Sequence, residues 1–316
     1  METRLETLLD LPAEPHSNAF AGPTVSPVFS RRDASFVPGA VRTSVMVLEL
    51  DAHYLRLAVA DAPTDADSTH RVRLLEEFAM PGSGGDEPTL HDVRHLMSSH
   101  DVMTRNFWQS VRVLVSNQSF TLIPESLFRK EYAIRYLELA RGTALTNERV
   151  YYTRHPEWQA VTVFSLPARL DDWLMSLYPF EKLQFFHQTD ALIELGHDVL
   201  PPEGKAFLLY LETASVGMVY CEAGRLHYAN RFVFRTISDL VYYVAFVLNE
   251  LKIDPAEITV LAMGQFNANS EAYNELAKHL PGFALRHPSV GASLKDGFAD
   301  IASHQYAALL RTFALA

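Results

Sequence analysis

Cysteine, glycine and long apolar runs are scarce in this chain of 316 residues. Cys221 is its one cysteine, so no disulfide can form within the chain, which favours a reducing compartment. The 14 glycines are about 4% of the residues, against about 7% in average proteins, which leaves few positions for loops that wrap phosphates. The apolar run at residues 241–248, even with Leu240 before it, is far shorter than the roughly 18 residues of a membrane-spanning helix.

Positive charge is also in deficit, because 27 basic and 38 acidic residues give a formal net charge of −11. An acidic chain repels the phosphate backbone, so we expect no nucleic-acid partner. Residues 1–10 carry three acidic side chains and no cationic start, which is unlike a signal peptide. Together with the lone cysteine, this predicts a cytoplasmic protein that does not insert into a membrane.

Residues 11–40 are rich in proline, which can sustain neither a helix nor an inner strand. We therefore expect residues 1–40 to form an extended N-terminal arm that packs, if it packs, through Phe20, Phe29 and Phe36. The prolines of this arm are Pro12, Pro15, Pro23, Pro27 and Pro38.

Beyond the arm, the order strand, strand, strand, helix, strand, helix occurs twice, beginning near residue 45 and again near residue 206. This duplication predicts an α/β protein of two lobes, over residues 41–200 and 201–316, each with a mixed sheet opened by an antiparallel three-stranded meander. The first copy has strands at 45–50, 54–60, 71–78 and 111–116 and helices at 88–103 and 124–140. The second has strands at 206–211, 216–221, 225–234 and 258–263 and helices at 238–251 and 270–280. Further strands are expected at 150–153 and 161–166, and further helices at 168–178, 190–200 and 300–313.

A carboxylate ends the first strand of each copy, Asp51 in one and Glu212 in the other. Three further blocks are residues 120–128 (FTLIPESLF), residues 187–193 (HQTDALI) and residues 222–264, which run from EAGRL to LAMG. With these features, residues 45–287 resemble an uncharacterised bacterial family of unknown function that has an actin-like ATPase fold, a duplicated ribonuclease-H-like fold of the ASKHA group.

The resemblance implies a nucleotide site whose motifs are degenerate in this chain. Actin-like ATPases use an Asp-x-Gly turn in each half, and the two glycine positions are His53 and Ala214 here. Glu212 replaces the second aspartate, and the double glycine under the adenosine is reduced to Gly264. Asp51, Glu212 and Gly264 are then remnants, and no cofactor is expected. The alternative from the residues themselves is that both carboxylates simply order their turns.

The strand at residues 225–234 is expected to have two different faces. Arg225, Arg231 and Arg235 share one parity with His227, and the apolar residues share the other. The cationic side is a candidate docking face for an acidic partner or a neighbouring subunit. The alternative is a solvated strand face whose arginines pair with local carboxylates. The apolar residues are Leu226, Tyr228, Phe232 and Phe234.

No motif of an enzyme's active site is present, so no catalytic residue is assigned and the chain is expected not to be an enzyme. His91 and His95 have the spacing of a metal pair on one helix face, although an exposed helix with several histidines explains them too. Cys221 alternates with apolar residues and is expected to be buried, not a nucleophile.

The favoured hypothesis is a non-enzymatic, actin-like scaffold or adaptor that binds a protein partner or itself. The alternatives are a weak or altered nucleotide-binding ATPase that uses Asp51, Glu212 and Gly264, and a metal-dependent enzyme built on His91 and His95.

Overall fold

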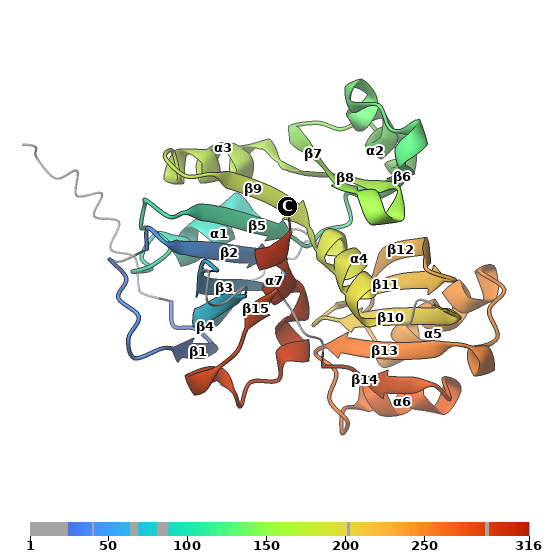
Figure 1. Cartoon of the computed structure of the whole chain (residues 1–316). Coiled ribbons are helices and arrows are strands. Elements are labelled where there is room, and N and C mark those ends of the chain that lie inside the picture. The colour runs from blue at the N-terminus through green and yellow to red at the C-terminus, as the bar shows by residue number, and fades with distance from the viewer. Residues whose placement is uncertain are drawn as a thin grey trace, which may run out of the picture.

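Three β-sheets make up the framework of the computed structural model, which describes residues 25–39, 41–63, 69–80, 88–200, 203–287 and 291–315. A seven-stranded and a five-stranded sheet form two lobes, at the left and right of Figure 1. A three-stranded sheet lies above them. We call this third part the insert.

The first lobe is built on a meander whose buried residues are mostly apolar, because both faces of the sheet are covered. β2, β3 and β4 pair antiparallel, and β5 and β9 continue the sheet in parallel on the far side of β2. The strands are β2 (Ser44–Leu50), β3 (Tyr54–Asp61), β4 (His70–Ala79), β5 (Ser110–Val115) and β9 (Leu183–His187).

The second lobe repeats this plan. The strand order β12-β11-β10-β13-β14 matches β4-β3-β2-β5-β9, with two antiparallel pairs followed by two parallel ones. The predicted duplication is therefore confirmed, although β9 and β14 were not foreseen. The strands are β10 (Lys205–Leu211), β11 (Ser215–Glu222), β12 (Arg225–Val233), β13 (Thr259–Gly264) and β14 (Phe283–Leu285).

Helices cover the outer faces of both sheets and fill the space between the lobes. On α5, residues Leu240, Val244 and Leu248 point into the second lobe's core at helical spacing. α1 and α3 pack on the first sheet, α5 and α6 on the second, and α4 and α7 lie between the two. The helices are α1 (Leu90–Met97), α3 (Ala168–Leu177), α4 (Gln188–Val199), α5 (Ile237–Glu250), α6 (Glu271–His279) and α7 (Ala307–Arg311).

The insert has its own small core, in which Leu137 of one helix packs against Val161 and Val163 of the central strand. The strands pair antiparallel in the order β6-β8-β7. The expected helix at 124–140 begins only at Ala133, because two short 3₁₀ turns, Glu125–Leu127 and Lys130–Tyr132, stand between β6 and the helix. The elements are β6 (Phe120–Pro124), α2 (Ala133–Arg141), β7 (Glu148–His155) and β8 (Ala160–Pro167).

The described part of the proline-rich arm is attached to the first lobe. β1 (Phe29–Arg32) pairs antiparallel with β4 and forms an edge of the sheet, a place that proline-rich sequence tolerates. The Phe29 ring lies 5.9 Å from that of Tyr306, and Phe36 packs against the core. Phe20 lies outside the described residues.

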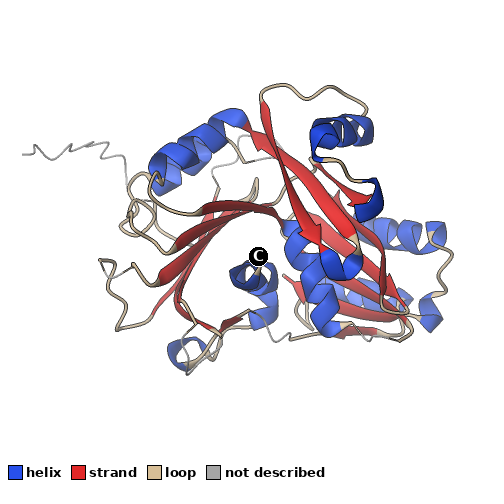
Figure 2. Ribbon diagram, turned by 45° about the horizontal axis from the view of Figure 1, so that its top comes forward, coloured by secondary structure: helices blue, strands red, loops and turns tan. Residues whose placement is uncertain are grey.

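The C-terminal segment returns to the first lobe. β15 (Ala292–Ser293) pairs with β4, and Leu310 and Phe313 pack against the meander, which curves around α7 in Figure 2. The helix expected at 300–313 is shorter, with short 3₁₀ turns on either side of α7. We propose that residues 291–315 be counted with the first lobe and keep the boundary near residue 200 as a proposal.

Candidate functional site

The two hairpin turns that begin at Asp51 and Glu212 lie where the lobes meet, and each carboxylate pairs with an arginine of the other lobe. Asp51 orders its own turn, because its Oδ1 accepts a hydrogen bond from the His53 amide at 2.9 Å. Its Oδ2 accepts a second one from Arg231 Nη2 of the other lobe at 2.8 Å. Both side chains of this ion pair are almost fully buried. The negative charge of Asp51 is therefore already matched within the chain.

Arg231 is thus not on the surface where the strand pattern placed it. A β-bulge leaves His227 as an extra, unpaired residue in β12. On either side of it, Leu226 pairs with Cys221 and Tyr228 pairs with Tyr220. The bulge moves Leu226 onto the same face as Arg231, and this face is covered by α4 and the insert. The expected two-sided pattern is wrong for Leu226, and Arg231 is a buried ion-pair residue. Arg225 and Arg235 are exposed.

A second ion-pair network centres on Arg56, whose side chain is 0% exposed. Arg56 donates from Nη1 and Nη2 to the two oxygens of Glu212, each at 3.0 Å, in a bidentate pair that joins the lobes. Nη1 also lies 3.2 Å from Glu49 Oε2, and Nε lies 2.7 Å from Glu77 Oε2. Glu49, Arg56 and Glu77 are direct neighbours across β2, β3 and β4, which aligns their side chains.

Gln188 and two tyrosines complete this network, which we call the Arg56 cluster. Gln188 Nε2, at the start of α4, donates to Glu49 Oε1 at 3.0 Å and lies 3.4 Å from Glu212 Oε1. The Tyr54 ring lies 3.9 Å from Arg56 Cζ, and the Tyr306 ring lies 5.4 Å from it. Each guanidinium nitrogen of Arg56 therefore has a carboxylate partner, and aromatic rings pack against the group.

Burial dominates the acid–base behaviour of the Arg56 cluster. It raises the pKa of Glu49 above its ordinary value and that of Glu212 to about 7, although the Arg56 charge opposes both shifts. Burial alone would lower the pKa of Arg56, but the carboxylates of Glu212 and Glu49 raise it well above its usual range. The guanidinium stays charged while the carboxylates hold a proton more readily than exposed ones do.

Gly264 has a local reason to be glycine. Its φ is +81°, and a Cβ there would lie 2.1 Å from the backbone oxygen of Leu211. The next residue, Gln265, donates its amide to that same oxygen at 2.7 Å. The close approach of β13 to the end of β10 requires this glycine whether or not a nucleotide binds.

A family model described as "Protein of unknown function (DUF3822)" matches residues 40–283, more than half of the chain. The chain belongs to this DUF3822 family. No curated protein matches it in sequence.

Two solved structures share its architecture. A Bacteroides thetaiotaomicron protein with an actin-like ATPase fold and unknown function is 18% identical, with a TM-score of 0.68 over 79% of this chain and 93% of that chain. The PilM-PilN type IV pilus biogenesis complex matches with 13% identity and a TM-score of 0.57, over 85% of this chain and 97% of that chain. Such identities show the fold alone. The DUF3822 chain has an actin-like ATPase fold, which confirms the fold that the resemblance implied.

The residues between the two turns do not fit the phosphates of a nucleotide. A bound triphosphate is held by free backbone amides and by cationic side chains. Here the amides of His53 and Glu212 already donate within their own turns. The two cations at this place, Arg56 and Arg231, are engaged by carboxylates. The uncompensated charges of the Arg56 cluster are acidic and would repel a phosphate.

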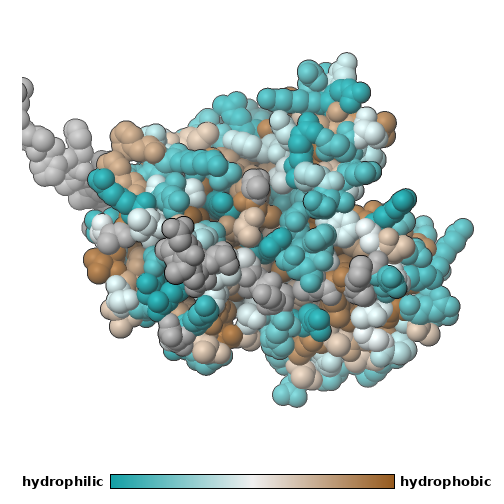
Figure 3. Space-filling model, in the orientation of Figure 1, coloured by the Kyte–Doolittle hydropathy of each residue, from teal (hydrophilic) through white to brown (hydrophobic). Residues whose placement is uncertain are grey.

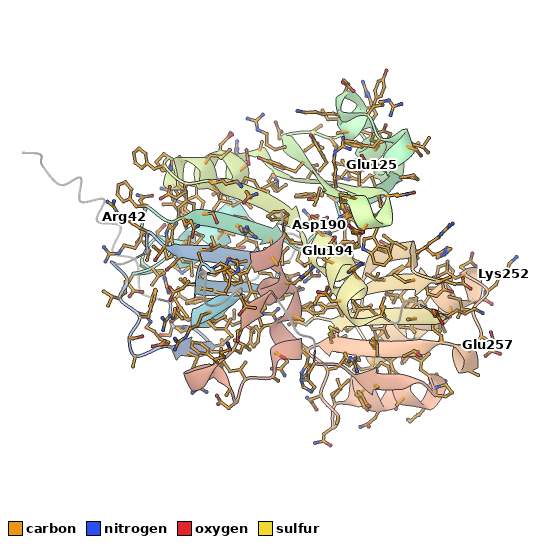
Figure 4. The ribbon with its side chains drawn as sticks, viewed as in Figure 1. Arg42, Glu125, Asp190, Glu194, Lys252 and Glu257 are labelled. Carbon is orange, nitrogen blue, oxygen red and sulfur yellow. The ribbon has the colours of Figure 1, made fainter. Side chains whose placement is uncertain are left out.

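A further buried cluster joins the insert to α4 and was not foreseen. His155 of β7 lies 3.1 Å from Asp190 Oδ1 through Nε2 and 3.0 Å from Glu194 Oε1 through Nδ1. Burial alone would lower the pKa of His155, but the two carboxylates raise it to about 9. Figure 4 shows Asp190 and Glu194 on α4, beside the insert. The charged imidazole thus fixes the insert to the helix between the lobes.

The remaining candidates do not form a reactive site. His91 and His95 stack with 6.5 Å between ring centroids on the exposed side of α1. The described residues contain no group of three or more histidine, cysteine, aspartate or glutamate side chains that could hold a metal ion. Cys221 is buried, and burial raises the pKa of its thiol to about 12, so it is not a ready nucleophile. Within the described segments, no helix is long and apolar enough to cross a bilayer.

Proposed function

We propose that this DUF3822 chain is a non-enzymatic adaptor, or pseudoenzyme, on an actin-like fold, which acts by binding a protein and does not use ATP. The observation that carries the proposal is the bidentate pair between Arg56 and Glu212. It joins the two lobes with the chain's own charges at the place between the turns where phosphates would be held.

The energy of this pair opposes nucleotide binding. ATP would have to break the pairs of Arg56 and Arg231 before it could use either cation. Removing one partner from a buried ion pair leaves an uncompensated charge, which costs about 3–5 kcal/mol. A loss of that size moves a micromolar dissociation constant to the millimolar range.

A protein partner is favoured over other ligands by two observations. The name of the PilM-PilN complex says that a protein of this fold assembles with another protein. The acidic net charge and the lone cysteine favour a cytoplasmic setting without nucleic acid.

Calorimetric titration of the full chain with Mg-ATP tests the proposal. We expect a dissociation constant weaker than about 1 mM and no hydrolysis above background, with Arg235→Ala as a surface control. A micromolar constant that Asp51→Ala removes would contradict the proposal and support the weak ATPase instead.

A further inference from the structure

A groove of about 690 Å³ runs between the insert and the second lobe. One wall is β6 and the other is the first half of β12, and these two strands are edges of their sheets. In Figure 3 the surface is hollowed at the right, below the insert. The lining residues are Gln118, residues 120–124, Ala140, residues 158–160 and residues 226–230.

The outward backbone groups of β6 face this groove. Ser119 accepts from the Ser165 amide and Glu125 donates to Gln159, so the odd-numbered residues of β6 bond to β8. The N–H and C=O groups of Phe120 and Leu122 therefore point away from β8. They form no hydrogen bond with another described residue. Pro124 follows at the next outward position, where a missing N–H has no cost.

The two walls are joined at one end of the groove, and the floor is apolar. With its side-chain amide turned, Gln118 donates to the Arg231 carbonyl and accepts from Arg231 Nη1, next to the lining residue Asn230. Along the floor, Leu122 of β6 and Leu226 of β12 both pack against the core between the lobes. An unpaired edge about 17 Å long, beside an apolar floor, has the dimensions of one extended peptide.

One end of the groove lies beside basic residues. His227 lines the groove and is exposed, and Arg225, directly before the lining residue Leu226, is exposed as well. Neither forms an ion pair with another described residue. Glu222 is opposite Arg225 in the strand register, but its carboxylate accepts a hydrogen bond from Tyr220. The Arg225 charge, which has no ion-pair partner among the described residues of a chain of net charge −11, favours an acidic ligand at this place.

We propose that the groove binds an extended segment of a partner protein, which adds to β6 as a fourth strand and places a carboxylate beside Arg225 and His227. Main-chain hydrogen bonds to Phe120 and Leu122 supply the affinity, and the apolar floor with the basic end supplies the selectivity. This inference rests on the adaptor function proposed above, since it names the surface that such an adaptor uses.

Selection from a phage-displayed library of random twelve-residue peptides tests the groove with a defined probe. We expect enriched sequences that alternate apolar and polar residues and carry Asp or Glu. Ala140→Trp fills the groove from α2, and it should weaken the selected peptide at least tenfold. Leu139→Trp is the matched control, because Leu139 is 84% exposed on the same helix and does not line the groove.

The basic end and the mode of pairing are tested with the same selected peptide. Arg225→Glu should weaken binding about tenfold, whereas Arg235→Glu, at an exposed residue beyond the groove, should leave it unchanged. Hydrogen exchange of the full chain should show the amides of Phe120 and Leu122 becoming protected when the peptide binds.

Failure to enrich any peptide, equal binding by Ala140→Trp, or unchanged exchange along β6 would each overturn this inference. These results are distinguishable from failure of the proposed function, because Mg-ATP titration reports on the turns and peptide binding reports on the groove. A chain that binds Mg-ATP tightly and also binds the peptide would overturn the first proposal alone.

Discussion

The space between the hairpin turns and the groove beside β6 differ in how completely the chain satisfies its own polar groups. At the turns, Asp51 pairs with Arg231, and Arg56 pairs with three glutamates. At the groove, a row of backbone groups and the Arg225 side chain have no partner among the described residues. Apart from Arg231 Nε, the charged groups at the turns are engaged within the chain, whereas the outward backbone groups of β6 are free to pair with a ligand.

This difference suggests that the place where an actin-like fold would hold a nucleotide is not the place where this chain binds its ligand. The actin-like fold brings the two turns together, yet the side chains at that place are used for holding the lobes. The insert, which lies outside the repeated plan of the two lobes, supplies the surface with free binding capacity. Function is therefore better sought at the insert than at the site that the fold suggests.

Breaking the Arg56 cluster should give the largest loss of folding stability. Arg56→Met leaves Glu49 and Glu212 buried without their cation, and we expect a loss of about 3–5 kcal/mol in the free energy of unfolding. Urea denaturation near neutral pH measures it. The control is Arg31→Met, whose pair with Asp300 is exposed and should contribute less than about 1 kcal/mol. Equal effects of the two substitutions would mean that the cluster does not hold the lobes.

Gly264→Ala tests whether this glycine is structural. A positive φ and a Cβ in contact with Leu211 should together cost about 3 kcal/mol. Gly142→Ala is matched to it, since its φ is +69° but nothing lies within 4 Å of the added Cβ, and it should cost about 1 kcal/mol. If thermal unfolding shows the two variants to be alike, the close approach of the strands does not explain Gly264.

The His155 cluster should make stability fall as the solution becomes alkaline. The folded-state pKa of about 9 lies above the ordinary 6.5, so this stabilisation is complete below pH 6.5 and is lost as the pH rises through 9. The shift corresponds to about 3 kcal/mol. His155→Asn should be less stable than the wild type at pH 6.5. Between pH 6.5 and pH 9 its free energy of unfolding, measured by urea denaturation at each pH, should fall much less than that of the wild type. His197→Asn, at an exposed residue of α4, should keep the wild-type pH dependence of the unfolding free energy. A wild-type protein whose stability does not change over this pH range would refute the role given to His155.

The smallest change in folding stability is expected for a substitution beside the groove when no ligand is bound. Arg225→Ala removes an exposed side chain without an ion pair, so the free energy of unfolding should change by less than about 0.5 kcal/mol. A substantially larger loss in urea would show that Arg225 has a structural partner, and it would then be a poor candidate for binding.

The repeated meanders could be predicted because their strands have strong local signals, mostly apolar residues bounded by turns and polar loops. β9 and β14 are short, and β15 depends on pairing with β4, so no local signal marks them. The insert was expected as separate strands, because sequence does not show which strands pair with one another.

Among the site residues, Asp51 and Glu212 were found from the turns, but their partners were not. Arg231 was placed on the surface because the sequence does not show that α4 and the insert cover this face of β12. The bulge at His227 changes only the faces of the residues before it, such as Leu226. Arg56 had a usable signal, since a charged residue between apolar neighbours in a strand buried on both faces must find partners nearby. Glu49 and Glu77 lie opposite it once the strand register is known.

Hydrogen exchange of the full chain, with and without millimolar Mg-ATP, tests the central claim most directly, because it reads both regions in one experiment. We predict unchanged exchange at residues 51–54 and 212–215, since these turns are already held by internal hydrogen bonds and ion pairs. Protection at both turns on addition of Mg-ATP, with no change along β6, would contradict the account and return the nucleotide to the site between the lobes.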